Sequence, residues 1–237
     1  THRYSSAASD VYKRQLIPRP ETELIIEKIL KILPSSSNKN ILDIGTGSGC
    51  IAISLINERP DCRITAIDKS KKAIKVAKKN AEMHQVGKKV KFINIDVDKY
   101  LCNKYDLIIS NPPYIKNSEL LSLDKDVKLN EPKLALSGGT SGLETLFKII
   151  NKCKMLLKIN GMLILEIGHK QGKDLSKYLN LNGFNQTKIY KDLSGKDRCL
   201  VSTKSYWWII LKITIEEIGS DQIAIGTSKK EMVMDIN

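Results

Sequence analysis

Aromatic side chains, paired cysteines and long apolar runs are all scarce in this sequence, and each scarcity excludes a class of protein. Phe, Trp and Tyr make up only 5% of the 237 residues, too few for a surface that stacks nucleic-acid bases. The five cysteines are scattered, form no Cys-x-x-Cys pair and are joined by only three histidines, which argues against a disulfide framework or a metal site. No apolar run reaches membrane-spanning length. We therefore expect a soluble, cytoplasmic protein with no membrane segment.

Positive charge is what the sequence has in excess, with a formal net charge of +13. Much of it is lysine in helical patterns such as residues 69–82. Clustered cations suit a nucleic-acid partner because they release counterions from phosphate, but they also occur on solvated helix faces. The shortage of aromatic residues favours solvated faces, so nucleic acid is not the expected partner.

The two ends of the chain differ in character from its middle. Residues 1–15 lack periodicity, and we interpret them as a non-native leader. Residues 205–237 hold one apolar burst, YWWIILKITI, and a polar tail, so their structure stays open between an extra strand, a partner-facing edge and an ill-packed tail. Residues 16–204 are predicted to form one domain.

Strand and helix patterns alternate within that domain. Short runs rich in Ile, Val and Leu predict strands buried on both faces at residues 40–44, 63–68, 90–95, 105–110 and 161–167. Helical periodicity predicts helices between them at residues 50–58, 71–84, 143–157 and 171–182. This alternation is typical of an α/β fold with a doubly wound, mostly parallel sheet, whose sites lie at the carboxyl ends of the strands.

A glycine-rich loop, LDIGTGSGC at residues 42–50, follows the first predicted strand and precedes a helix. Gly45, Thr46, Gly47 and Gly49 would let the backbone approach an anionic ligand at the helix N-terminus. The G-x-G-x-G spacing differs from a dinucleotide fingerprint and suits S-adenosyl-L-methionine. Asp68, at the end of the second strand, is placed to accept the ribose hydroxyls.

The third predicted strand is followed by Asp96 and Val97. The Asp96 carboxylate is placed to accept from the adenine amino group, while the Val97 N–H donates to the ring. An alternative for Asp96 is the cap of a turn.

Asn111, Pro112, Pro113 and Tyr114 follow the fourth predicted strand directly. Each carbonyl before a proline is held extended, so the Asn111 and Pro112 carbonyls and the Asn111 side-chain oxygen form a cluster of acceptors beside the cofactor loop. Such a cluster suits a substrate that bears an –NH₂ group, with Tyr114 packed against its plane. We predict Asn111, Pro112 and Tyr114 as catalytic residues, all four as substrate-binding residues, and Asn111 as a further cofactor contact. The alternative is a tight surface turn.

These residues resemble the HemK-type glutamine N5-methyltransferases that modify peptide-chain release factors. The resemblance covers about residues 16–204 and rests on stretches in the same order: LIPRPETE at 16–23, LDIGTGSG at 42–49, SNPPYI at 110–115, NEPKLALSGGTSGLETL at 130–146, LEIGHKQG at 165–172 and DLSGKDRCLVS at 192–202. It implies a seven-stranded, Rossmann-like class I methyltransferase sheet that closes near residues 198–203. It also implies S-adenosyl-L-methionine as the cofactor and class 1 release factors as the protein substrate.

The resemblance assigns roles to further residues. Asn111 and the Pro112 carbonyl would hold the glutamine amide of the Gly-Gly-Gln loop, and Asp43 would brace the glycine loop. The segment before the first strand would close over the cofactor through Arg19, Pro20 and Thr22, with a helix N-terminus as the alternative. Glu131 and Pro132 would shape the pocket wall or form a structural turn, and His169 is expected on the surface without a role.

One departure from the family pattern leaves other functions open. Family members begin with a small helical domain that grips the release factor, whereas this sequence begins at the catalytic domain. An N6-adenine-type DNA or RNA amino-methyltransferase, favoured by the basic charge, and a cofactor-binding fragment without activity are therefore the two alternatives.

Overall fold

The computed structural model describes residues 20–101, 104–123 and 132–205. By its internal contacts the chain divides into Thr1–Ser205 and Tyr206–Asn237, and every described residue belongs to the first unit. The predicted leader at 1–15 and the tail after Ser205 lie outside the described residues, so both interpretations stay predictions.

The domain alternates helices and strands along the chain. The helices are α1 Pro20–Ile32, α2 Cys50–Glu58, α3 Lys71–Met83, α5 Lys133–Leu136, α6 Glu144–Leu156 and α7 Gly172–Leu181, with short 3₁₀ turns η1 Val97–Lys99 and η2 Asn117–Ser122. The strands are β1 Asn40–Ile44, β2 Arg63–Asp68, β3 Val90–Asn94, β4 Tyr105–Ser110, β5 Ile115–Lys116, β6 Ser137–Gly139, β7 Leu157–Glu166, β8 Phe184–Lys191 and β9 Asp197–Lys204.

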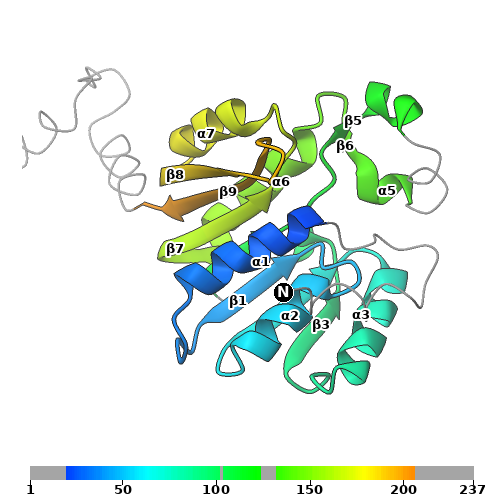
Figure 1. Cartoon of the computed structure of the whole chain (residues 1–237), viewed down its shortest axis with the longest axis vertical. Helices are drawn as coiled ribbons and strands as arrows, with labels where there is room; N and C mark the ends of the chain where they lie inside the picture. The colour runs from blue at the N-terminus through cyan, green and yellow to red at the C-terminus, as the bar shows by residue number, and fades with distance from the viewer. Residues whose placement is uncertain (1–19, 102–103, 124–131, 206–237) are drawn as a thin grey trace, which may run out of the picture. The chain divides into compact units, whose positions relative to one another are not determined.

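Seven of these strands form one sheet in the order β3-β2-β1-β4-β7-β9-β8 (Figure 1). The first five run parallel, and β9 is antiparallel to both of its neighbours. The prediction of an α/β, doubly wound, mostly parallel seven-stranded sheet is thereby confirmed. The chain leaves β1 toward β2 on one side and returns to β4 on the other, so the strand order reverses between β1 and β4. Doubly wound sheets bind their ligands at such a reversal.

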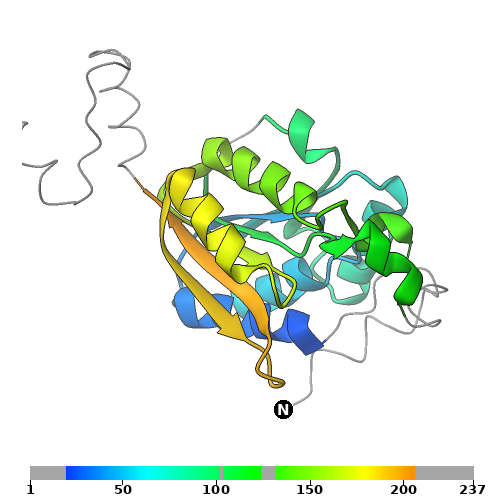
Figure 2. The ribbon, with the colours of Figure 1, turned by 90° about the horizontal axis from the view of Figure 1, so that it is seen from above.

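Both faces of the sheet are covered by helices, which explains the continuous apolar runs of the strands (Figure 2). Leu107 and Ile109 on β4 pack into a cluster with α1, α2 and α3. The residue between them, Ile108, packs into a second cluster with α6 and α7. All three side chains are fully buried. Successive side chains of a strand point to opposite faces, so a strand between two helix layers has to be apolar throughout.

Several elements of the domain were not predicted: the short elements α5, β5, β6, η1 and η2, and the longer α1 and β8. Residues 20–32 form helix α1, so the helix start held as an alternative for the segment around Thr22 is what the structure shows. Residues 184–191 form the outer strand β8, whose side chains alternate in burial instead of being apolar throughout. In the part of the chain that is described, no helix has both the length and the apolar character needed to cross a membrane.

Candidate active site

The carboxyl ends of four parallel strands meet at one edge of the sheet. Ile44 at the end of β1 pairs with Ile67 on β2 and with Ser110 on β4, and Ser110 pairs in turn with Leu165 on β7. The Ser110 hydroxyl also donates to the Ile44 carbonyl across 2.7 Å. The segments that follow β1, β2 and β4 and the last residue of β7 are therefore neighbours in space.

The glycine loop after β1 offers an open backbone surface. Gly45 and Gly47 have φ angles of +72° and +57°, which residues with a side chain rarely adopt. A Cβ atom built on Gly45 would meet nothing within 4 Å, and one on Gly47 would meet only the Gly45 carbonyl at 4.0 Å. The loop thus leaves room beside its backbone, as a ligand cradle requires.

Gly49 has a different task from the other two glycines. It precedes α2 in a left-handed conformation, and a Cβ there would lie 3.1 Å from the Ala77 Cβ on α3. The small residue lets the start of α2 pack closely against α3. Its predicted contact with a cofactor stays a prediction.

The loop is held from below by Asp43, the fourth residue of β1. Its carboxylate is 1% exposed and accepts a 2.7 Å hydrogen bond from the Thr46 hydroxyl. Burial raises the Asp43 pKa to about 7; the Thr46 bond opposes this shift, and the charge of Asp68 adds to it. This geometry agrees with the expected role of Asp43 in bracing the glycine loop. The Thr46 hydroxyl hydrogen is used in the hydrogen bond to Asp43.

Asp68 ends β2 beside the loop, as predicted. One of its oxygens accepts from the Gly47 N–H at 3.0 Å, and the other accepts from the Ser70 N–H at 2.7 Å. A carboxylate has about four lone-pair sites, so both oxygens keep capacity for further donors. The arrangement joins the acidic group and the glycine loop into one surface.

Asp96 caps η1, which is the turn-cap alternative considered for this residue. Its carboxylate accepts from the Asp98 N–H at 3.0 Å and from the Lys148 Nζ at 3.2 Å. These hydrogen bonds, the backbone one first, hold the Asp96 pKa below its ordinary value. Binding of an adenine amino group by Asp96, with Val97 donating to the ring, stays a prediction.

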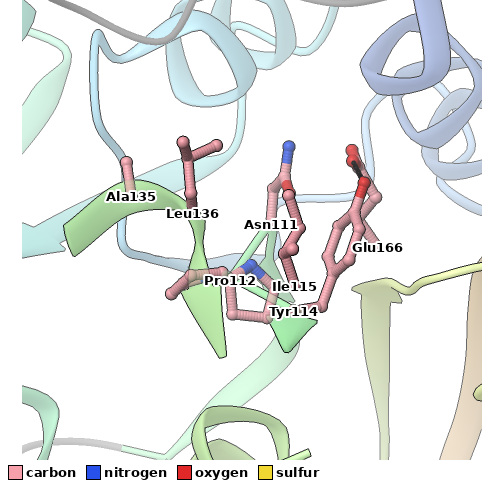
Figure 3. A pocket seen from close by; sticks show the side chains of 8 residues that line it. Asn111, Pro112, Tyr114, Ile115, Ala135, Leu136 and Glu166 are labelled. Atoms are coloured by element: carbon pink, nitrogen blue, oxygen red, sulfur yellow. Dashed lines mark hydrogen bonds between the residues drawn. The ribbon is translucent and has the colours of Figure 1, made fainter. Parts of the chain in front are cut away.

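The Asn-Pro-Pro-Tyr segment lines a pocket at the end of β4 (Figure 3). Pro112 is buried, and the other three residues are half-buried. The pocket is lined by Asn111, Pro112, Pro113, Tyr114, Ile115, Ala135, Leu136 and Glu166. In Figure 3, Ala135 and Leu136 lie on one side of Asn111, and Tyr114 and Glu166 lie on the other. The site therefore has an apolar wall opposite an acidic one.

Glu166, the last residue of β7, connects the pocket to helix α1. The Tyr114 hydroxyl donates to Glu166 Oε1 at 3.3 Å, and the Thr22 hydroxyl donates to Glu166 Oε2 at 3.4 Å. Thr22 Oγ1 in turn accepts from Asn111 Nδ2 at 3.4 Å. Glu166 is only 2% exposed. The buried carboxylate thus contacts Tyr114 directly and is linked to Asn111 through Thr22.

The backbone of the motif is clamped from the other side. Gln171 Nε2 donates to the carbonyls of Tyr114 and Gly142, and its Oε1 accepts from the Gly168 N–H at 2.8 Å. A Cβ on Gly138 would lie 2.7 Å from the Tyr114 Cα. Residues of the two stretches that gave the family resemblance at 130–146 and 165–172 therefore hold the Asn-Pro-Pro-Tyr segment in shape.

Sequence reasoning assigned no role to Glu166 or Gln171. An acidic residue that ends a parallel strand, as Glu166 does, is a signal that could have found the first. No local signal points to Gln171, whose partners are distant in the sequence. Pro132 and His169 are exposed, the latter as expected, whereas Arg19 and Glu131 lie outside the described residues.

The donors and acceptors beside the glycine loop suit an organic cofactor. Among residues 20–101, 104–123 and 132–205, no group of three His, Cys, Asp or Glu side chains could hold a metal. The open glycine backbone and the adjoining Asp68 carboxylate instead offer one anion-binding and one hydroxyl-binding position. These are the groups that S-adenosylmethionine presents, a carboxylate and a ribose.

Comparison with solved structures agrees with this fold. A methyltransferase from Pyrococcus furiosus superposes with a TM-score of 0.63 at 20% identity, covering 83% of this chain and 88% of that one. A SAM-dependent O-methyltransferase from Thermotoga maritima gives 0.60 at 16% identity, covering 81% and 68%. Residues 21–127 match the family described as the methyltransferase small domain. The fold and the paired site define a class I S-adenosylmethionine-dependent methyltransferase.

Comparison with curated sequences gives the family. The chain is 39% identical over 193 residues to the release factor glutamine methyltransferase of Thermodesulfovibrio yellowstonii, covering 80% of this chain and 69% of that protein. It is 42% identical over 195 residues to the protein of the same name from Lactococcus lactis, covering 82% and 71%. The chain belongs to the release factor glutamine methyltransferase family.

Proposed function

We propose that this protein transfers a methyl group from S-adenosyl-L-methionine to the side-chain amide nitrogen of the glutamine in the Gly-Gly-Gln motif of class 1 release factors. The observation that carries the proposal is the pocket formed by Asn111, Pro112 and Tyr114 directly beside the glycine loop. The names of the related proteins supply the release factor as substrate. A protein that acts on release factors works where translation occurs, so we place it in the cytoplasm.

The cofactor half of the site is assigned to the ends of β1 and β2. The Gly45–Gly47 backbone would receive the amino-acid part of the cofactor, and Asp68 would accept from its ribose hydroxyls. When bound, S-adenosylmethionine supplies a methyl group already activated on a sulfonium. The chain therefore has to position the acceptor nitrogen and exclude competing water, and positioning of this kind can supply most of the rate enhancement.

The acceptor half is assigned to Asn111 and its neighbours. The Asn111 Oδ1 and the Pro112 carbonyl would each accept one hydrogen of the glutamine –NH₂, which fixes the direction of the nitrogen lone pair. Tyr114 would pack beside the amide plane, while Leu136 forms the apolar wall across the pocket. As the nitrogen bonds to the methyl carbon, the bond from that carbon to sulfur would break and leave a neutral thioether. One amide proton would be released to water, so no strong general base is required.

One methyl-transfer assay separates this proposal from its two alternatives. Tritium-labelled cofactor is incubated with a release factor, with the same factor carrying a substitution of the Gly-Gly-Gln glutamine, and with DNA and RNA. Label in the intact factor alone supports the proposal. Label in nucleic acid would instead support an amino-methyltransferase acting on bases, and cofactor binding without label in any acceptor would support the inactive fragment.

DNA and RNA are included in that assay because one part of the structure is rich in lysine. Residues 69–91, around α3, contain nine lysines and a single acidic residue, Glu82. Lys71, Lys75 and Lys79 are exposed on α3. This face belongs to the β3 side of the sheet, whereas the acceptor pocket lies at the end of β4. We therefore assign the lysines to a solvated face and not to the acceptor pocket.

A further inference from the structure

The Asn111 side chain can serve as an acceptor in only one of its two orientations. Rotation of the amide by 180° exchanges Oδ1 and Nδ2, which have nearly the same shape but opposite hydrogen-bonding character. With Nδ2 in the pocket, a donor would face the substrate –NH₂ and repel it. A neighbouring group therefore has to fix the Asn111 amide in the orientation in which Oδ1 faces the substrate.

The contacts of Thr22 and Glu166 contain such a selector. As a carboxylate, Glu166 can only accept hydrogen bonds. The Thr22 hydroxyl therefore has to donate its one hydrogen to Glu166 Oε2. Toward Asn111 the same hydroxyl then has only lone pairs left. It accepts from Nδ2, and Oδ1 is left for the other side of the amide. Each bond fixes the direction of the next.

The surroundings of Glu166 strengthen this control. The carboxylate is 2% exposed, so water cannot easily replace either donor. Its second oxygen accepts from the Tyr114 hydroxyl, which fixes the direction of that group as well. The bonds through Thr22 measure 3.4 Å. Hydrogen bonds of catalytic groups are often long without substrate and shorten when it binds.

We propose that Glu166 is a positioning residue that, through the Thr22 hydroxyl, orients the Asn111 amide so that Oδ1 faces the substrate amide. The inference rests on the proposed function, because it presupposes an –NH₂ substrate. It assigns to the end of β7 and the first turn of α1 a role in acceptor binding. Neither the glycine loop nor Asp68 takes part in it.

We call the chain of hydrogen bonds from Glu166 through Thr22 to Asn111 the relay. Three single variants test it by kinetics with a release factor as acceptor. Thr22→Ser keeps the hydroxyl and should stay within about threefold of wild-type kcat. Thr22→Val has nearly the same volume but no hydroxyl, and Glu166→Gln can donate as well as accept. Thr22→Val and Glu166→Gln should each lower kcat by about 10- to 100-fold, with an unchanged dissociation constant for S-adenosylmethionine, because these variants lose only the orientation of Asn111.

The double variant Glu166→Gln/Thr22→Val distinguishes a relay from two independent contributions. If both residues act through one amide, the double variant should lose no more than about threefold beyond the worse single variant. Losses that multiply would overturn the proposal, as would full kcat in Thr22→Val. A loss of cofactor affinity in Thr22→Val but not in Glu166→Gln would assign Thr22 to the cofactor and would also overturn it.

A measurement without turnover keeps the inference separate from the proposed function. In protein labelled with ¹⁵N-asparagine, the Asn111 side-chain amide is the signal that Asn111→Ala removes. It should shift in Thr22→Val and Glu166→Gln and stay in place in Thr22→Ser. If Glu166→Gln does not fold, the two Thr22 variants decide. An unmoved signal in Thr22→Val refutes the relay, whereas failure of wild-type protein to label a release factor refutes the proposed function alone.

Discussion

The two halves of the site are held together by different kinds of contact. On the cofactor side, Gly47 and Ser70 donate to Asp68, and Thr46 donates to Asp43. In each of these hydrogen bonds the two partners are at most 21 residues apart in the sequence. On the acceptor side, Asn111 reaches Thr22 across 89 residues of sequence, and Tyr114 reaches Glu166 across 52. Cofactor binding thus depends on local structure around two strand ends, whereas acceptor binding depends on how α1, β4 and β7 pack together. The two functions should be separable by mutation.

The largest separation is expected at Asn111. Asn111→Ala should lower methyl transfer by about two to four orders of magnitude, because the substrate nitrogen loses the group that positions it. Cofactor affinity, measured by calorimetry on the same preparation, should stay nearly intact. Loss of cofactor binding together with a lower melting temperature would make the Asn-Pro-Pro-Tyr stretch a structural turn and would remove the distinction between the halves.

Asp68 tests the other half. Asp68→Ala should weaken S-adenosylmethionine binding by roughly 1.5 to 3 kcal/mol through the loss of charge-assisted hydrogen bonds. Asp68→Asn keeps the shape and one acceptor oxygen, so its affinity should lie between those of Asp68→Ala and the wild type. At saturating cofactor both variants should keep most of their kcat. Unchanged affinity in both would show that the end of β2 does not hold the cofactor.

Asp43 gives the cofactor half a pH dependence of stability. Burial raises its pKa from 3.8 to about 7, so the folded state favours the neutral carboxyl of Asp43. The stability that this preference gives the folded state is fully present below pH 3.8 and is lost as pH rises through about 7. Asp43→Asn is neutral throughout. Relative to this variant, the wild-type free energy of unfolding should fall by about 2 kcal/mol between pH 5 and pH 7.5. Parallel profiles in urea unfolding would contradict the raised pKa.

A pair of glycines offers the smallest and most controlled test of the acceptor half. Gly142 and Gly195 have φ angles of +79° and +75°, so alanine costs about 1 kcal/mol of backbone strain at either position. Only at Gly142 would the new Cβ meet the Tyr114 carbonyl, at 2.6 Å; at Gly195 it meets nothing within 4 Å. Gly142→Ala should therefore lower methyl transfer about tenfold relative to Gly195→Ala, with similar cofactor affinity in both. Equal activities would mean that the clamp on Tyr114 is not needed.

The same division explains what could be predicted from the sequence. Strands β1, β2 and β4 and helix α2 have the predicted bounds, because each is an apolar run that ends at a turn residue or a glycine. The glycine loop and Asp68 were found for the same local reason. Strand β8 was missed because it lies at the edge of the sheet, where Phe184 is its one buried residue and half-buried residues alternate with exposed ones over 185–189.

Residues that act across the sheet could not be found in this way. Thr22 was read as a cofactor-closing residue or a helix start, and its contact with Asn111 depends on how α1 packs beside β7. Glu166 precedes Ile167 in an apolar run, and only the strand order brings it next to Tyr114. The cap formed by Asp96 was foreseen as an alternative, but its ion pair with Lys148 was not.

The outermost strands of the sheet, β3 and β8, have a consequence for how copies of this protein behave at high concentration. Among residues 20–101, 104–123 and 132–205, each of these strands has a neighbouring strand on one side only, and the row of backbone N–H and C=O groups on the other side can template aggregation. Exposed lysines stand on both strands, Lys91 on β3 and Lys188 and Lys191 on β8. Bringing two such edges together would force like charges into contact and strip them of water. The lysines at the sheet margins therefore guard against edge-to-edge pairing.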